Sequence, residues 1–317
     1  MMTPAEIRLK QNPILTSMLL GLGQGSFIAE KLFPRLPQVL SSVTLAKVGD
    51  ERLRKYGLKR APGTPTKRID IKYDGQTYTV DQASVEVPIP RELIREADES
   101  RRLNVGNYLD ISQIAMVTAN DVLLLDYELD VATIATTPAT YAAGHVVTLA
   151  GATKWSHVDG TPVDDIEAAS NLIRKKLGRR PNKLTLSADA FVAVKNNIQV
   201  RSYVPDSQLG APTIAQLQNI FNVEEIVVGE AIWKAEDDVG ADVWGNNAIL
   251  AYVPRMAGAN ISLAEPAFGF TNVIEGHPFA ETPYFSNEFK SWVYGATYER
   301  RPNVAYNTAA VLFQNPK

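Results

Sequence analysis

The chain of 317 residues contains no cysteine. Disulfides, thiol nucleophiles and thiolate metal sites are therefore excluded. Histidine is also scarce: His145, His157 and His277 form no HxH or HxxxH pair. We therefore predict no metal and no cofactor, and we expect three imidazoles that lie on the surface or in loops.

Long apolar runs are missing as well. No stretch approaches the roughly 18 apolar residues that a bilayer crossing needs. Residues 1–6 lack the basic flank and the apolar run of a secretory signal. We expect a soluble protein made in the cytoplasm, without a membrane partner.

The motifs that carry catalysis are absent too. The sequence has no GxSxG nucleophile elbow and no Walker lysine. The glycines of residues 21–26 resemble a phosphate loop in composition only, since no strand precedes them, and a flexible bend is the favoured interpretation. We predict that the chain is not an enzyme and has no catalytic residue. A soluble enzyme with an α+β domain stays as an alternative, and a clustered polar pocket would be its mark.

What is present is a globular composition with an uneven charge. With 45% hydrophobic and 21% charged residues, the chain is neither disordered nor a fibrous rod. Residues 1–73 contain 13 Lys/Arg and 5 Asp/Glu, a balance of +8, whereas the remainder has a balance of −11. This asymmetry predicts a basic segment with its own partner, either nucleic acid or the acidic part of another copy.

The first 85 residues predict two extended segments without a core. Residues 1–49 alternate apolar patches with Pro and Gly, which leaves room for a helix only at about 27–33. Residues 50–85 combine a basic stretch, a Pro/Gly-rich tip and an alternating strand at 67–73, with Asp74 and Gly75 as a hairpin turn before 76–80. The period-2 alternation then returns at Val85, Val87 and Ile89. An isolated ribbon is marginal in water, so both segments should lie on another surface.

The remaining chain predicts a long helix and a compact α+β unit. Residues 104–136 form a helix of about 45 Å at 1.5 Å per residue, since no Pro or Gly interrupts them after Gly106. The apolar residues expected on its buried face are Ile111, Ile114, Ala115, Thr118, Val122, Leu125, Leu129 and Ala132. Helices are expected at 164–177, 188–196 and 213–221, and strands at 146–149, 181–186, 225–228, 242–244, 248–253, 291–298 and 304–313.

This order of parts resembles the major capsid proteins of tailed bacteriophages, whose Hong Kong phage type fold is shared with encapsulins. Each segment that carries the resemblance is similar to a family motif, although Phe270 stands where the family has Tyr. The segments are 25–34 (GSFIAEKLFP), 60–63 (RAPG), 147–149 (VTL), 153–156 (TKWS), 164–168 (DDIEA), 180–184 (RPNKL), 221–229 (FNVEEIVVG), 243–245 (VWG) and 266–271 (PAFGFT).

The resemblance implies an α+β phage capsid fold. Its parts are an N-terminal arm (1–49), an extended loop or E-loop (50–85), a peripheral P-domain (86–154 and 263–317) with a spine helix at about 104–136, and an axial A-domain (155–262). The chain would be a structural protein that forms hexamers and pentamers of an icosahedral head shell. That shell would enclose viral double-stranded DNA without sequence recognition, in a virion made in the host cytoplasm.

The resemblance also implies partners. Because the arm begins within a few residues of Met1, we expect a separate scaffolding protein rather than a fused one, together with a portal; a decoration protein is a further candidate. An encapsulin-like compartment shell is the closest alternative, and packaged nucleic acid would distinguish the two. A DNA-binding module that uses the basic region is another, and its binding would fall steeply with salt.

Charge and apolar content together suggest which residues join neighbouring subunits. Cations of the loop should lie over acids near the long helix, and exposed pairs worth ~0.2–1 kcal/mol each would guide register more than strength. Burial of apolar side chains, at ~25 cal/mol per Å², should dominate. The predicted interface residues are Phe27, Ile28, Phe33, Arg52, Arg54, Lys55, Lys59, Arg60, Lys67, Arg68, Asp121, Asp126, Glu128 and Asp130.

Overall fold

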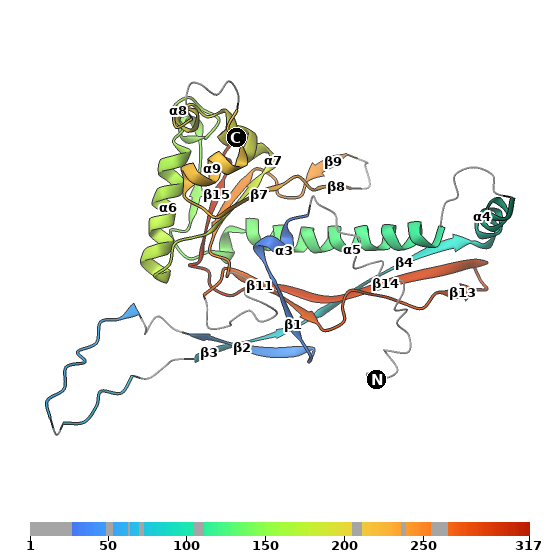
Figure 1. Ribbon diagram of the computed structural model, residues 1–317, viewed down its shortest axis with the longest axis horizontal. Coiled ribbons are helices and arrows are strands. Elements are labelled where there is room, and N and C mark those ends of the chain that lie inside the picture. The colour runs from blue at the N-terminus through green and yellow to red at the C-terminus, as the bar shows by residue number, and fades with distance from the viewer. Residues whose placement is uncertain are drawn as a thin grey trace.

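The computed structural model describes residues 27–48, 53–62, 64–69, 73–103, 111–204, 211–235, 239–254 and 266–317. These residues form a six-stranded sheet beneath a long helix, a five-stranded sheet flanked by helices, and a ribbon that extends beyond both (Figure 1). The predicted α+β class is confirmed. In the described part of the chain, no helix has the length and hydropathy needed to cross a membrane.

The six-stranded sheet is built around one long strand. β14 (Ser291–Val304) pairs antiparallel with β4 (Asp81–Pro90) along the whole of β4. Alternate residues of β4 turn toward the hydrophobic core, as the period-2 pattern of Val85, Val87 and Ile89 predicts. The other strands are β1 (Arg35–Gln38), β11 (Gly269–Ile274), β12 (Phe279–Ala280) and β13 (Tyr284–Ser286).

The long helix, α5 (Ile111–Thr136), lies along one face of this sheet (Figure 1). Its existence is confirmed from residue 111, and residues 104–110 lie outside the described residues. The predicted buried face is wrong in part: Ala115 and Ala132 are buried, but Ile114 and Val122 are 47% and 48% exposed. The side chains that pack on the sheet are instead Met116, Ala119, Leu123, Tyr127, Val131 and Ala135.

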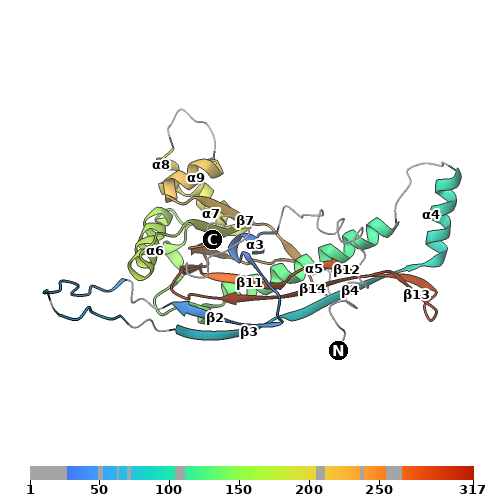
Figure 2. The ribbon, with the colours of Figure 1, turned by 60° about the horizontal axis from the view of Figure 1, so that its bottom comes forward.

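Two shorter helices lie near the ends of these elements. α3 (Ala29–Leu32) packs on α5, in the segment where the sequence predicts a helix. α4 (Arg91–Leu103) follows β4 at the end of the sheet opposite the ribbon and was not predicted (Figure 2). Only a few of its side chains are apolar, although its apolar and polar residues lie on different sides of the helix.

The five-stranded sheet has the order β5-β15-β10-β6-β7. Its position differs from the predicted domain boundaries, because the C-terminal strand β15 lies inside it between β10 and β5. Strands near 146 and 312 thus belong to the unit predicted for 155–262. The strands are β5 (Val146–Thr148), β6 (Lys183–Ser187), β7 (Glu225–Gly229), β10 (Asn247–Ala251) and β15 (Ala310–Gln314), and the helices are α6 (Pro162–Leu177), α7 (Ala188–Asn196), α8 (Ile198–Ser202) and α9 (Ile214–Phe221).

Two ribbons lie outside the main sheets. β2 (Ser42–Val48) pairs with β3 (Tyr73–Thr79) to form the ribbon that extends from the body (Figure 2). The predicted turn at Asp74 and Gly75 is wrong, because both residues lie within β3, opposite Lys47 and Ala46. The partner strand comes from the arm side, so the ladder encloses residues 49–72, and residues 67–69 are not strand. The second ribbon joins β8 (Ile232–Lys234) and β9 (Gly240–Asp242).

Candidate functional site

The loop between β2 and β3 presents a cationic and apolar surface. Residues 53–69 contain six Lys/Arg and no Asp/Glu. Every described residue of this loop is exposed except half-buried Tyr56. Arg60 donates a hydrogen bond to the carbonyl of Thr64 (3.0 Å), which helps to shape the tip. Leu58 and Ile69 are exposed among the cations, an arrangement suited to contact with an acidic, apolar surface.

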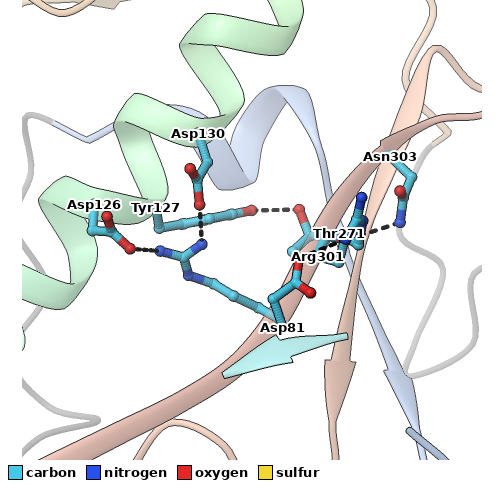
Figure 3. A network of polar contacts seen from close by, with 8 residues as sticks. Asp81, Asp126, Tyr127, Asp130, Thr271, Arg301 and Asn303 are labelled. Atoms are coloured by element: carbon cyan, nitrogen blue, oxygen red, sulfur yellow. Dashed lines mark hydrogen bonds and ion pairs between the residues drawn. The ribbon is translucent and has the colours of Figure 1, made fainter. Parts of the chain in front are cut away.

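Two of the predicted acids lie on α5 and share one arginine of β14. The Nη2 atom of Arg300 is 2.6 Å from Asp126, and its Nη1 atom is 2.5 Å from Asp130 (Figure 3). The guanidinium also lies 5.0 Å from the ring centre of Tyr127. The arginine side chain is buried, whereas Asp126 and Asp130 are 55% and 49% exposed. Both carboxylates therefore have a free side toward solvent.

A groove of about 720 Å³ opens beside this ion-pair network. Its charged lining consists of Asp81, Asp126, Asp130, Arg300 and Arg301, so that acids outnumber cations. Arg301 pairs with Asp81 at 2.6 Å (Figure 3). Tyr78 of β3 also lines the groove, so the groove lies where the extended ribbon joins the rest of the chain. The groove is suited to a cationic segment rather than to an anion.

The side of α5 away from the sheet is apolar. Ile114 and Val122 are exposed on it, and Leu125 and Leu129 are half-buried. We call these four residues the apolar stripe. At 100° per residue, Asp121 borders the stripe on one side, and Asp126 borders it on the other. The helix contains no Lys or Arg, so this whole surface has one sign of charge.

Glu128, also predicted at the interface, is instead buried within the chain. Its carboxylate accepts hydrogen bonds from the backbone N–H groups of Ile28 and Ala29 and from the indole of Trp244. Burial raises the pKa of Glu128, and these three donors oppose that shift. A neighbouring subunit cannot reach this carboxylate.

The prediction that Ile28 and Phe33 of the arm lie at the subunit interface is also corrected. Ile28 and Phe33 are buried within their own chain, and the Phe33 ring lies edge-on to Phe268 with 5.4 Å between centroids. Their apolar surface is covered by the chain's own core. Phe27 is half-buried. Arg52 lies outside the described residues, and the other loop cations are exposed.

All three histidines lie in loops, as predicted, although His145 is buried and the side chain of His277 is only 6% exposed. His145 Nδ1 lies 2.9 Å from the carbonyl oxygen of Ala310. His277 Nδ1 accepts from the N–H of Glu299 at 3.1 Å, and burial lowers the pKa of His277. Within the described ranges, no group of three or more His, Asp or Glu side chains could hold a metal ion.

Sequence reasoning missed Arg300 and Trp244. A signal for Arg300 exists: Tyr294, Ala296 and Tyr298 alternate on the core-facing side of β14, and Arg300 continues that register. Such an inward arginine requires buried or bridging acids. For Trp244 no comparable signal exists, because its carboxylate partner is 116 residues away in the chain.

Comparisons with known proteins agree with this architecture. No protein-family model matches the chain. The major capsid protein of Burkholderia phage BcepMu is 33% identical over 273 residues, which cover 86% of this chain and 86% of that protein. The crystal structure of a phage-related protein from Bordetella bronchiseptica is 35% identical, with a TM-score of 0.76. The match covers 97% of this chain and 97% of that chain.

Two more distant structures share the fold. The capsid of cyanophage P-SCSP1u is 14% identical with a TM-score of 0.57, covering 92% of this chain and 89% of that one. The SrpI encapsulin of Synechococcus elongatus is 12% identical with a TM-score of 0.55, and the match covers 99% of this chain and 95% of that chain. These two likenesses bear on architecture alone.

Proposed function

The chain belongs to the major capsid proteins of tailed bacteriophages, and from this premise we propose that it builds an icosahedral head shell around viral double-stranded DNA. The observation that carries the proposal is the 33% identity to a phage major capsid protein over 86% of the chain. As a member of this family, it is a structural protein that assembles with copies of itself into a capsid. We also propose that the shell consists of hexamers and pentamers and that it holds the DNA without sequence recognition. The chain would be synthesised in the host cytoplasm.

We assign the parts of the fold to the parts of a capsid subunit. The ribbon β2–β3 and its loop are the E-loop, and the six-stranded sheet with α5 is the P-domain. The five-stranded sheet is the A-domain, with β5 and β15 included because they pair within it. The segment that leads through α3 into β1 is the N-terminal arm.

We further propose that the loop of one copy lies on the apolar stripe and the adjoining acids of the next. Charge complementarity supports this: residues 53–69 of the loop contain six cations and no acid, and α5 has acids and no cation. Each exposed ion pair adds ~0.2–1 kcal/mol, so charge sets the register. Burial of Leu58 against Ile114 and Val122 would add more, since fully burying a leucine contributes about 1.5–3 kcal/mol.

Charge reversal in the loop tests this contact. The triple variant Arg54→Glu, Lys55→Glu and Lys59→Glu should lose particles in size-exclusion chromatography and negative-stain microscopy, with unchanged circular dichroism and melting temperature. The control reverses two exposed cations of α6, Lys175→Glu and Lys176→Glu, and should assemble normally. Wild-type particle yields from the triple variant would contradict the loop–helix contact, though not the shell.

A separate scaffolding protein, a portal and a decoration protein are proposed as further partners. An encapsulin-like compartment is the second candidate function, favoured by the likeness to the SrpI encapsulin. The two shells differ in content: purified native particles should contain double-stranded DNA if the chain is a head protein. Particles that contain an enzyme cargo and no DNA would support the compartment instead.

A further inference from the structure

Three segments far apart in the sequence meet at the buried carboxylate of Glu128. Its Oε2 atom lies 2.8 Å from the N–H nitrogen of Ala29, and the N–H nitrogen of Ile28 is 3.0 Å from both oxygens. Its Oε1 atom also accepts from Trp244 Nε1 at 2.7 Å. One side chain of α5 thus binds the arm and the turn that precedes β10.

The carboxylate supplies the cap that α3 lacks. This helix has only four residues, and Ile28 at its N-cap position offers no side-chain acceptor. The first N–H groups of a helix need an acceptor, and here Glu128 provides it from another element. No described Lys, Arg or His forms an ion pair with this carboxylate, so its compensation comes from the three donors. Loss of one donor therefore weakens the arrangement that holds the other two.

Trp244 belongs to the five-stranded unit. Its indole packs so closely on Gly229 of β7 that a Cβ atom there would overlap the ring. Its carbonyl accepts a hydrogen bond from the Asn247 side chain at 3.0 Å, at the start of β10. Any displacement of the five-stranded unit from α5 would therefore carry the indole away from Glu128.

We propose that Glu128 couples the N-terminal arm to the five-stranded unit: when Trp244 leaves the carboxylate, the hold on Ile28 and Ala29 weakens and α3 loosens. Glu128 is then a positioning residue for the arm, and the position of the unit is transmitted to the arm through it. This coupling belongs to the single chain and does not rest on the proposed loop–helix contact.

Hydrogen–deuterium exchange of the full chain tests the coupling. In Trp244→Phe, the peptide spanning residues 28–34 should exchange about tenfold faster, because one charge-assisted bond is lost. The control is Trp155→Phe. Trp155 is also fully buried in the five-stranded unit, and its indole donates to a carboxylate, Asp165, at 2.9 Å. This variant should leave exchange of the arm peptide unchanged.

A double variant tests whether the effect of Trp244 on the arm depends on Glu128. Glu128→Gln should raise exchange of the same peptide, and adding Trp244→Phe should then raise it no further. Equal effects of Trp244→Phe and Trp155→Phe would overturn the coupling, as would an unchanged arm in Trp244→Phe. Additive effects of the Trp244 and Glu128 substitutions would overturn it too. If Glu128→Gln does not fold, the comparison of the two tryptophan variants decides alone.

Discussion

The ring of Phe33 lies directly on Gly269, where a single added Cβ atom would overlap Cε1 of the ring. The carbonyl oxygen of Asn303 is only 2.7 Å from the same position. A residue with a side chain cannot stand there without displacing either the arm or β14. Glycine at the start of β11 therefore creates the seat that holds the arm against the sheet.

Replacement of Gly269 by alanine should expel Phe33. We expect Gly269→Ala to lower the free energy of unfolding by about 1–3 kcal/mol, the usual cost of overpacking. Urea denaturation would measure it. The control is Gly240→Ala, because no atom lies within 4 Å of a Cβ built at Gly240. Equal stability of the two variants would show that the arm seat tolerates a methyl group.

The orientation of α5 predicts opposite results for two adjacent residues. Val122 lies on the apolar stripe, whereas Leu123 is buried against the sheet. Leu123→Ala should cost about 2–5 kcal/mol of folding free energy, since it leaves a cavity. Val122→Ala should change it by no more than about 0.5 kcal/mol, as for surface positions. Thermal and urea unfolding would compare them, and a large loss for Val122→Ala would place the stripe in the core.

The two adjacent arginines of β14 should also differ in how much they contribute to folding stability. Arg300 is buried and forks between Asp126 and Asp130, while Arg301 is 48% exposed and pairs with the exposed Asp81. Arg300→Lys loses the fork and should cost about 1.5–3 kcal/mol, the value of a charge-assisted hydrogen bond. The matched change Arg301→Lys should cost less than about 1 kcal/mol, as exposed ion pairs do. Similar losses in chemical denaturation would contradict this ranking.

We expect the folding stability to decrease in acid, because the side chain of His277 is buried. Burial lowers the pKa of His277, and the nearby carboxylate of Glu299 opposes the shift without reversing it. The unfolded chain therefore binds this proton more readily. The stability is fully present above the ordinary histidine pKa of about 6.5 and is lost as pH falls from there toward the lower folded pKa.

Urea denaturation at about pH 7.5 and about pH 5.5 would test this prediction, since the two values bracket the ordinary histidine pKa. The decrease in stability should be smaller in His277→Gln than in the wild-type chain. His157→Gln is the control, because that ring is exposed and should leave the decrease unchanged. An identical decrease in all three proteins would assign the acid sensitivity to other groups.

Much of the fold could be predicted from local patterns. Period-2 alternation identified β4, and uninterrupted helical spacing identified α5 from residue 111. Local patterns gave wrong predictions where they were compatible with two different structures. α5 is apolar on two sides, so spacing alone could not tell the face on the sheet from the exposed stripe. Asp74 and Gly75 suit a turn, but the seven-residue ladder with β2 holds them in an extended strand.

The candidate site divides in the same way. The exposed cations of residues 53–69 could be recognised because Lys and Arg side chains are almost never fully buried unless they are paired. Ile28, Phe33 and Glu128 could not be placed, because their burial depends on contacts about 100 residues or more away in the chain. Arg300 is intermediate: its strand register indicated an inward side chain, but not which acids it would meet.

The sequence by itself determined the absence of thiol chemistry, the uneven distribution of charge, the long helix and the cationic character of the extended loop. These properties follow from residue identity and short-range spacing. Only the tertiary structure decided which face of α5 is covered, that β15 completes the five-stranded sheet, and that Glu128 binds the arm rather than a neighbouring subunit. Burial and partner choice depend on which distant segments meet, and no local periodicity records that.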